Sequence, residues 1–267
     1  MSVDHPLPDV KSQSVTTDAF LGGRLTVAQP AAGFRAGLDS VLLGASVRQA
    51  GGRLLDLGSG VGVAGLVALA HHPRLDAVFA DADEHALGLC ARNIAANVMA
   101  LRAVTLMADA TLGGAARQRA GLAADAFDTV IANPPFYDRA RATAAPAAPE
   151  AHGHDAGRLE RWVRTACACL RPSSEAVFIH RAEALGELLQ AIGRRLGGVE
   201  ILPLAPYPGA AASRILVRGV KGSRAPLRLL SPLAVHAAKG AGFSVATEAV
   251  LRGETLLDWR AAARAPT

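Results

Sequence analysis

The stretch that decides the fold is LLDLGSGVGVAG, which runs from Leu54 to Gly65. It opens with apolar residues, as a strand buried inside a sheet does, and continues with glycines that permit a tight turn. A helical pattern, VGVAGLVALAHH, follows directly. Because the first N–H groups of a helix are free to bind an anionic or polar part of a ligand, the stretch predicts a ligand-binding turn between a strand and a helix.

Strand-like and helix-like segments alternate from this stretch onward as far as Gly198. Such alternation indicates βαβ units and a parallel sheet. Two further strand-like segments, VEILPLAPY and SRILVRGV, are joined by a Pro-Gly turn without a helix, which predicts an antiparallel pair at the edge of the sheet. The fold class predicted is α/β, with a mostly parallel sheet and helices on both faces.

The chain of 267 residues is long enough for one large α/β domain. We expect a flexible N-terminus over residues 1–17 and a single domain over 18–267. That domain divides into a hairpin and helix over 18–50, the sheet core over 51–220, and a tail of short strand and helix over 221–267. The hairpin is expected around the proline-containing turn of TVAQPAAG, and Asp39 is the expected N-cap of the helix that follows.

The composition argues against several other classes. The chain has no apolar run as long as a membrane helix and no signal-peptide layout, so we expect a cytoplasmic protein without a membrane partner.

The three cysteines, Cys90, Cys167 and Cys169, lack the spacing of a zinc site and are expected to be buried thiols. His152 and His154 have no partner ligands nearby, so no metal is expected. The net charge of +5 only slightly favours a nucleic-acid partner.

Two classes of ligand fit the glycine turn. Gly60, Gly62 and Gly65 satisfy G-x-G-x-x-G, the fingerprint of dinucleotide-binding proteins. Asp56, at the end of the strand, would face a pyrophosphate with like charge, whereas it suits a cationic or zwitterionic ligand such as S-adenosylmethionine. We therefore favour a methyltransferase over a dehydrogenase, with a purely structural turn as the third interpretation.

Two more carboxylates end neighbouring strands of the predicted sheet. Asp81 ends the second strand, where a carboxylate accepts hydrogen bonds from both ribose hydroxyls. Asp109 ends the third strand, where it either accepts a hydrogen bond from an adenine amine or caps the helix that follows. The predicted cofactor-binding residues are Asp56, Gly58, Ser59, Gly60, Gly62, Asp81, Ala82, Asp109, Ala110 and Asn133.

A rigid polar segment, Asn133-Pro134-Pro135-Phe136, follows the fourth strand. Ligands of open α/β sheets bind outside the carboxyl ends of the strands, so Asn133 is expected to face the same crevice as the glycine turn. The Asn133 amide oxygen and the Pro134 carbonyl are two acceptors for the N–H bonds of an amine, and the prolines hold them in place. Phe136 offers a ring on which a base stacks. These four residues are the predicted catalytic set.

D-x-G-x-G-x-G combined with N-P-P-[FY] resembles the class I methyltransferases that modify amino groups of bases or the amide of a protein glutamine. Further segments narrow the resemblance, namely FLGGRLTVAQPAAGFRAGLDSVLLGA, ARNIAAN, FIHRAEALGELL, VRGVKGSRAPLRLLSPLAVH and EAVLRG. With them, the chain from Thr17 to Leu257 resembles the bacterial tRNA(Val) adenine-N6 methyltransferase family. The resemblance implies a Rossmann-like fold with a seven-stranded sheet whose last strand is antiparallel. It also implies S-adenosylmethionine as cofactor and tRNA as substrate.

Three alternatives stay open beside that family. They are guanine-N2 methylation of rRNA, methylation of a protein glutamine, and a non-catalytic module that keeps the fold and only binds RNA. The glutamine enzymes normally carry a separate helical N-terminal domain, for which the first 50 residues are too short.

The surface that would bind RNA is less well defined by the sequence. The Ala/Pro-rich segment 139–157 is interpreted either as a substrate lid or as disordered chain. Phosphate contacts are expected from a set of basic residues, with a solvated face as the alternative. The candidates are Arg139, Arg141, Arg214, Arg218, Lys221 and Arg224. His180 ends a strand and is interpreted either as a residue that lines the crevice or, preferably, as a core histidine.

Overall fold

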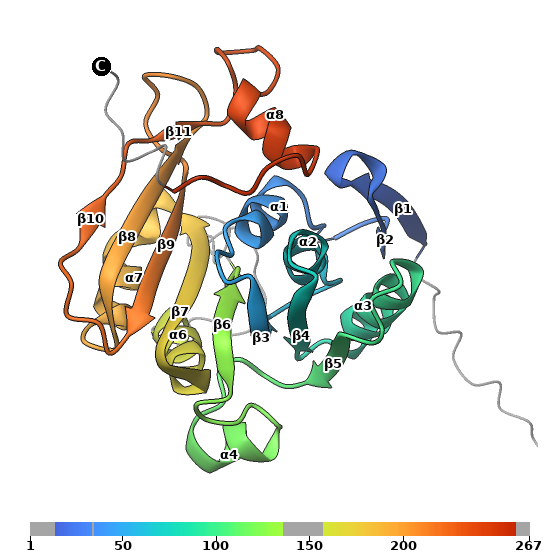
Figure 1. Ribbon diagram of the computed structural model, residues 1–267, viewed down its shortest axis with the longest axis vertical. Coiled ribbons are helices and arrows are strands. Elements are labelled where there is room, and N and C mark those ends of the chain that lie inside the picture. Colours follow the sequence, from blue (N-terminus) through green and yellow to red (C-terminus); the bar gives the residue numbers. More distant parts are fainter. Residues whose placement is uncertain (1–13, 34, 136–156, 260–267) are drawn as a thin grey trace, which may run out of the picture.

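The molecule is built on one mixed β-sheet, whose main strands lie in the order β5-β4-β3-β6-β7-β9-β8 (Figure 1). The computed structural model describes residues 14–33, 35–135 and 157–259. These strands are parallel except β9, which pairs antiparallel with β7 and β8. The seven strands are β3 (Gly51–Leu57), β4 (Arg74–Asp81), β5 (Ala103–Met107), β6 (Phe127–Ala132), β7 (Leu170–Arg181), β8 (Leu196–Ala205) and β9 (Arg214–Lys221).

The predicted α/β fold, with its antiparallel last strand, is confirmed. One detail differs, because β8 is not the edge of the sheet. Two short strands, β10 (Arg228–Leu229) and β11 (Leu233–Ala234), pair in parallel with β8 and extend the sheet beyond it. The tail, for which the sequence predicts a short strand and a helix, therefore adds to the sheet before it ends in α8 (Val245–Leu251).

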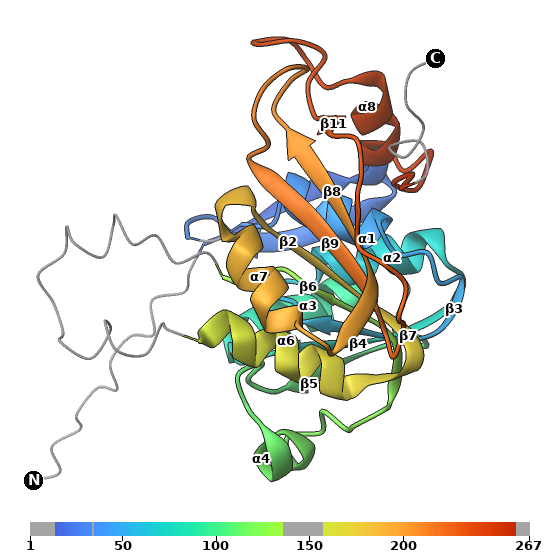
Figure 2. The ribbon, with the colours of Figure 1, turned by 90° about the vertical axis from the view of Figure 1, so that its left-hand side faces the viewer.

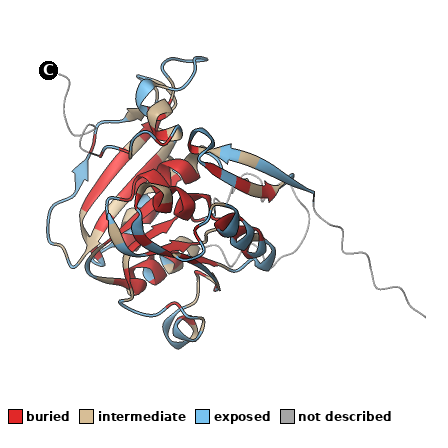
Figure 3. Cartoon of the chain, turned by 45° about the vertical axis from the view of Figure 1, so that its right-hand side comes forward, coloured by how far each residue is buried: buried red, intermediate tan, exposed pale blue. Residues whose placement is uncertain are grey.

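Helices cover both faces of the sheet, as the alternating pattern predicts (Figure 1, Figure 2). On one face, α1 (Leu38–Ala45), α2 (Val63–His71) and α3 (Glu84–Ala96) pack on a core that contains Leu54 and Ile131. On the other face, α6 (Arg158–Cys169) and α7 (Leu185–Ile192) pack on a core that contains Leu55 and Val130. Figure 3 shows that buried residues fill the strands and the inner faces of the helices. Consecutive residues of one strand thus enter two different cores, which explains the continuous apolar runs.

The N-terminal hairpin differs from the prediction in its turn. β1 (Val15–Phe20) pairs antiparallel with β2 (Leu25–Pro30), and the turn between them is the short helix η1 (Leu21–Gly23). Pro30 ends β2 instead of forming the turn. Since β1 begins at Val15, the hairpin also begins inside the segment 1–17, for which the sequence predicts a flexible terminus.

Two helices also differ from the prediction. Asp39 is not the N-cap of α1, because Gly37 holds that position, and Asp39 instead accepts a hydrogen bond from Arg214 at 2.9 Å. A short helix, α4 (Gly114–Arg119), lies between β5 and β6, and its N-cap is Gly113 and not Asp109. Its sequence, GAARQR, has too few apolar residues to give a helical pattern.

Gly44 sets how closely α1 approaches α2. A Cβ atom on Gly44 would lie 2.3 Å from the carbonyl oxygen of Ala64 and 2.7 Å from Cβ of Val67. The backbone of α2 therefore occupies the space that a side chain would need. Gly88 offers a contrast, because it is exposed in α3 and a Cβ there meets no atom within 4 Å in the described residues.

Gly44→Ala is expected to destabilise the protein by about 1–3 kcal/mol, because α1 must move away from α2. Gly88→Ala is the matched control and is expected to stabilise the protein by up to about 1 kcal/mol through helix propensity. Urea denaturation of both variants measures these changes in the free energy of unfolding. Equal effects of the two substitutions would contradict the close approach of the two helices.

Candidate active site

The residues predicted to bind ligands gather at the carboxyl edge of the sheet. Leu57 of β3 lies opposite Ala80 of β4 on one side and opposite Ala132 of β6 on the other. The next residues along the three strands are therefore neighbours at this edge: Gly58, Asp81 and Asn133. The order in which strands are added to the sheet reverses at β3, since β4 and β5 lie on one side of β3 and β6 lies on the other. Such switch points are where open α/β sheets bind their ligands.

The glycine turn leaves one side open to a ligand. A Cβ atom at Gly58 would lie 2.2 Å from the ring of Trp162, and one at Gly62 would lie 2.7 Å from Sγ of Cys90. A Cβ atom at Gly60, in contrast, would meet no atom within 4 Å in the described residues. All three glycines have positive φ, of 73°, 53° and 92° in chain order, which side chains rarely adopt. Trp162 and Cys90 thus pack against the inner side of the turn, whereas the backbone at Gly60 faces open space.

Backbone hydrogen bonds fix the turn against β4. The N–H groups of Gly58 and Ser59 both donate to the carbonyl of Ala80, at 2.7 and 3.0 Å. The N–H of Gly62 donates to the carbonyl of Ser59 at 2.9 Å. The turn therefore has little freedom to change shape when a ligand binds.

Asp56 lies beneath the turn, not on its open side. It is 2% exposed, and its Oδ2 accepts a hydrogen bond of 2.8 Å from the N–H of Gly65 in α2. Burial, together with the nearby charge of Asp81, raises the pKa of Asp56 to about 7, although the hydrogen bond from Gly65 opposes this rise. The sequence suggests that this carboxylate faces the ligand. Its position indicates instead that it holds the start of α2 on the end of β3.

Asp81 joins the glycine turn to the start of α3. Its Oδ2 accepts from the N–H of Gly60 at 2.7 Å, and its Oδ1 accepts from the N–H of Asp83 at 2.9 Å. A carboxylate has about four acceptor positions, so these two bonds leave capacity for two hydroxyl groups. Asp81 is partly exposed and Ala82 is exposed beside it, so both are accessible at the edge of the site.

Asp109 and Ala110 follow β5 at the same edge. Asp109 is partly exposed, and its Oδ1 accepts a hydrogen bond of 2.7 Å from the N–H of Thr111. It caps a turn and not a helix, since Gly113 is the N-cap of α4. Ala110 is 4% exposed and belongs to the core beneath α6.

Asn133 carries a buried acceptor at the end of β6. Within the described residues, its Oδ1 is shielded from solvent and has no hydrogen-bond partner. An unsatisfied buried acceptor costs about 1–3 kcal/mol, so such an atom is a candidate for contact with a substrate. Pro134 is buried and Pro135 is exposed. Phe136 lies outside the described residues.

Asn93, which sequence reasoning missed, supports the turn from α3. It is 1% exposed, and its Nδ2 donates to the carbonyl of Val61, inside the glycine turn, at 2.9 Å. It also binds both backbone groups of Ala28 in β2, accepting at 2.7 Å and donating at 3.0 Å. One side chain therefore ties the hairpin to the glycine turn. The signal in the sequence is an amide on the apolar face of an amphipathic helix.

Three of the predicted phosphate contacts, Arg218, Lys221 and Arg224, lie away from the site. Arg218 is 16% exposed and pairs with Glu175 at 2.6 Å and Glu200 at 3.2 Å. Lys221 donates to Asp125 at 2.8 Å and to two backbone carbonyls. Because β9 runs antiparallel, it carries these residues, and Arg224 after them, toward the amino ends of the parallel strands. Asn133 lies at the carboxyl ends. Arg139, Arg141 and the segment 139–156 lie outside the described residues.

Of the predicted phosphate contacts that the structure describes, Arg214 alone reaches the edge where Asn133 lies. It begins β9 opposite Arg181, the last residue of β7. His180, next to Arg181, is 7% exposed and lies in the core region as expected. Arg214 is therefore the basic residue from the predicted set that has the right location for contact with a substrate.

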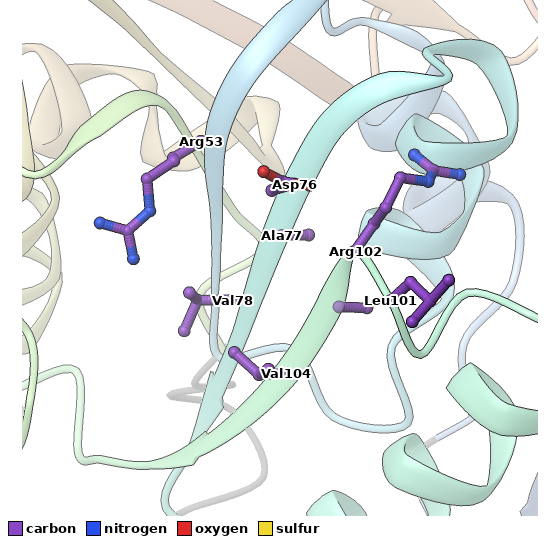
Figure 4. Close-up of a pocket in the computed structure, with 8 residues that line it drawn as sticks. Arg53, Asp76, Ala77, Val78, Leu101, Arg102 and Val104 are labelled. Carbon is purple, nitrogen blue, oxygen red and sulfur yellow. The ribbon is translucent and has the colours of Figure 1, made fainter.

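Several other features of the described chain were also predicted or sought. Cys90, Cys167 and Cys169 are buried free thiols, as predicted. The described residues hold no group of three metal-ligating side chains and no helix that could cross a membrane. A pocket of about 200 Å³ is lined by residues such as Arg53, Ala77 and Val104 (Figure 4). It lies toward the amino ends of β3, β4 and β5, so it is separate from the candidate site.

Comparisons with known proteins agree with the fold described above. The chain matches the methyltransferase small domain family over residues 36–151. Its structure is similar to that of a predicted O-methyltransferase from Agrobacterium tumefaciens, with 31% identity, a TM-score of 0.69, and 81% of this chain and 97% of that chain covered. No curated protein matches the chain.

Two more distant structures share the fold. One is TYW2 from M. jannaschii in complex with AdoMet, with 10% identity, a TM-score of 0.54, and 78% of this chain and 86% of that chain covered. The other is the 16S rRNA N2 methyltransferase RsmC from T. Thermophilus with AdoMet and guanosine, with 20% identity, a TM-score of 0.51, and 80% and 52% covered.

The fold and the site define a class I methyltransferase that uses S-adenosylmethionine. The chain belongs to the methyltransferase small domain family. The site fits the cofactor, because an open glycine turn, a carboxylate with spare acceptor capacity and an unsatisfied amide oxygen meet at one edge.

Asp56→Asn is expected to flatten the dependence of stability on pH. Because the pKa of Asp56 is raised from 3.8 to about 7 in the folded protein, its contribution to stability is full below about pH 4 and is lost as the pH rises to about 7. The loss is of the order of 4 kcal/mol, and asparagine keeps an acceptor for Gly65 without the charge.

Urea denaturation of the cofactor-free protein between about pH 4 and about pH 8 measures this effect. Asp83→Asn, at the exposed N-cap of α3, is the control for the loss of a carboxylate at the surface. Parallel pH curves for wild type and Asp56→Asn would show that Asp56 does not titrate as a buried group.

Proposed function

We propose that the protein transfers a methyl group from S-adenosylmethionine to the exocyclic N6 amine of an adenine in tRNA. The observation that carries this proposal is the buried Oδ1 of Asn133, which has no hydrogen-bond partner in the described chain and lies one strand from the glycine turn. The resemblance of the flanking segments to tRNA adenine-N6 methyltransferases supports the choice of base and RNA. The expected location is the cytoplasm.

The cofactor would be held along the open side of the glycine turn. Gly58, Ser59, Gly60 and Gly62 would contact it through the backbone, and Asp81, beside Ala82, would accept hydrogen bonds from its ribose hydroxyls. Asp109 and Ala110 would border its adenine. When bound, S-adenosylmethionine supplies an electrophilic methyl group. Asp56 acts indirectly, since it shapes the turn from beneath.

Asn133 and Pro134 would make the amine reactive. The lone pair of an adenine amine is delocalised into the ring, so the nitrogen is a poor nucleophile. Two acceptors, Oδ1 of Asn133 and the carbonyl of Pro134, would draw the two N–H bonds out of the ring plane and return the lone pair to nitrogen. Such oriented acceptors also stabilise the positive charge that develops on nitrogen. The proton leaves to water after the attack, so no side chain has to act as a strong base.

Pro135 would keep the Pro134 carbonyl in place, because a proline fixes its own φ and restricts the residue before it. Phe136 would stack on the base, which is worth about 1–3 kcal/mol. A base must leave its helix to reach this edge, and a nucleotide in a loop or single strand leaves at the lowest cost.

The acceptor pair favours nitrogen over oxygen as the methylated atom. A hydroxyl group has one hydrogen and would leave one of the two acceptors unpaired, whereas an amine or amide uses both. The similar structure from A. tumefaciens is described as a predicted O-methyltransferase. The experiment below therefore distinguishes methylation of nitrogen from methylation of oxygen. Three further functions compete with the proposal: methylation of guanine N2, methylation of a protein glutamine, and RNA binding without catalysis.

The deciding experiment incubates the protein with labelled S-adenosylmethionine and total RNA and then digests the RNA to nucleosides. The label is expected in N6-methyladenosine and in the tRNA fraction. Label in N2-methylguanosine or in a 2′-O-methyl nucleoside would replace the proposed acceptor. Label in added protein and not in RNA would favour a glutamine substrate.

Asn133→Ala is expected to lower the rate of methyl transfer about 100- to 1000-fold, the usual cost of one oriented group in a transition state. Affinity for S-adenosylmethionine, measured by calorimetry, should change little. Asn97→Ala is the control, because Asn97 binds the backbone of Thr26 in the hairpin and the carbonyl of Asn93 in α3, and these contacts lie away from the end of β6. Unchanged transfer by the Asn133 variant would refute the mechanism.

A further inference from the structure

Two arginines face each other across neighbouring strands at the edge of the candidate site. Arg181 ends β7 and Arg214 begins β9, and the two residues are direct partners in the antiparallel register. Like charges directly opposite each other destabilise a strand pair. Negative charge nearby, from a side chain or from a ligand, offsets this repulsion.

The arginine pair lies close to Asn133. β6, β7 and β9 are consecutive strands of the sheet (Figure 1), and Ala132 pairs with Phe178. Asn133 therefore leaves β6 next to Ile179, two residues before Arg181. Since strands are about 4.8 Å apart, β9 lies about 10 Å from β6. A nucleotide whose exocyclic amine reaches Asn133 has its phosphate on the far side of the base and the sugar, a separation on the order of two strand spacings.

Both arginines belong to the same face of the sheet. Side chains alternate along a strand, so Arg181 shares the face of Ile179, and Arg214 shares the face of Leu216. Ile179 and Leu216 both lie in the core beneath α1. Asp39, in the first turn of α1, accepts from Nε of Arg214 at 2.9 Å, and Arg214 is 33% exposed. The aspartate holds the guanidinium at the edge of the site, where solvent still reaches it.

The positive charge of the arginine pair affects the pKa of the neighbouring His180. Burial lowers the pKa of His180 to about 4, and the charges of Arg181 and Arg214 both lower it. His180 is thus neutral near pH 7 and adds no charge of its own. The positive charge at this end of β7 and β9 therefore comes from the two guanidinium groups.

We propose that Arg181 and Arg214 together bind a backbone phosphate of the RNA beside the nucleotide that is methylated. This inference rests on the proposed function, because it takes RNA as the substrate of the same edge. Two guanidinium groups on adjacent strands present planar sets of donors that suit the oxygen atoms of one phosphate. The pair would fix the position of the nucleotide, while Asn133 acts on its base.

The test compares Arg181→Gln and Arg214→Gln with the wild type in binding to bulk tRNA at several salt concentrations. Each substitution is expected to weaken binding about tenfold and to lower the slope of log affinity against log salt by about 0.7, the value for one lost phosphate contact on a single strand. Arg74→Gln is the matched control, because Arg74 is exposed at the start of β4, on the opposite edge of the sheet. It should leave affinity and slope unchanged.

Lysine variants separate charge from folding. Arg181→Lys and Arg214→Lys keep the positive charge and should recover most of the salt slope, with affinity between wild type and the glutamine variants. Calorimetric binding of S-adenosylmethionine should be the same in all variants. Lysine variants that behave like the glutamine variants, with cofactor binding intact, would overturn the proposal.

Two negative results have different meanings. Wild-type protein that methylates tRNA, with glutamine variants that keep the full affinity and salt slope, would overturn the phosphate site and leave the proposed function standing. Wild-type protein that transfers no label to any RNA would overturn both.

Discussion

The hydrogen bond from the Gly65 N–H to the buried carboxylate of Asp56 is the constraint on which the site depends. It joins the end of β3 to the first turn of α2 across the glycine turn. Phe79 fills the space beneath, since a Cβ atom at Gly65 would lie 2.3 Å from its ring. With the lower side of the turn packed in this way, Gly60 is the glycine left facing open space. The shape that would hold a cofactor therefore exists before any cofactor binds.

Side-chain hydrogen bonds also fix the glycine turn to neighbouring segments of the chain. Asp81 binds Gly60 on one side, and Asn93 binds Val61 on the other. Asn93 also binds Ala28, so the N-terminal hairpin is part of the support. Enzymes that act by positioning benefit from such preorganised sites, because little rearrangement is needed when the reactants bind. A transfer reaction without a strong base fits a site of this kind.

The sequence predicted the parts of the fold that local patterns control. The glycine turn, the alternation of strands and helices and the antiparallel last strand all follow from spacing and turn residues. The partners of Arg218 and Lys221 could not be predicted, because Glu175, Glu200 and Asp125 come from other segments of the chain. The hairpin turn was missed because Pro30 is a stronger turn signal than the residues of η1, although it only ends a strand. The burial of Asp56 beneath the turn could not be predicted, since sequence does not show which face of a turn is packed.

The direction of β9 decides which of its basic residues can meet a substrate. The strand carries Arg214, Arg218 and Lys221, and in sequence the three are equivalent candidates. Because β9 runs against β7, its first residue arrives at the carboxyl edge, while its later residues point to the other end of the sheet. There the carboxylates of Glu175 and Glu200 neutralise Arg218 and join β7, β8 and β9. One reversed strand thus places its cations in two settings. Arg218 is held in ion pairs with β7 and β8, whereas Arg214 pairs with Asp39 of α1 and stays partly exposed at the carboxyl edge, two strands from Asn133.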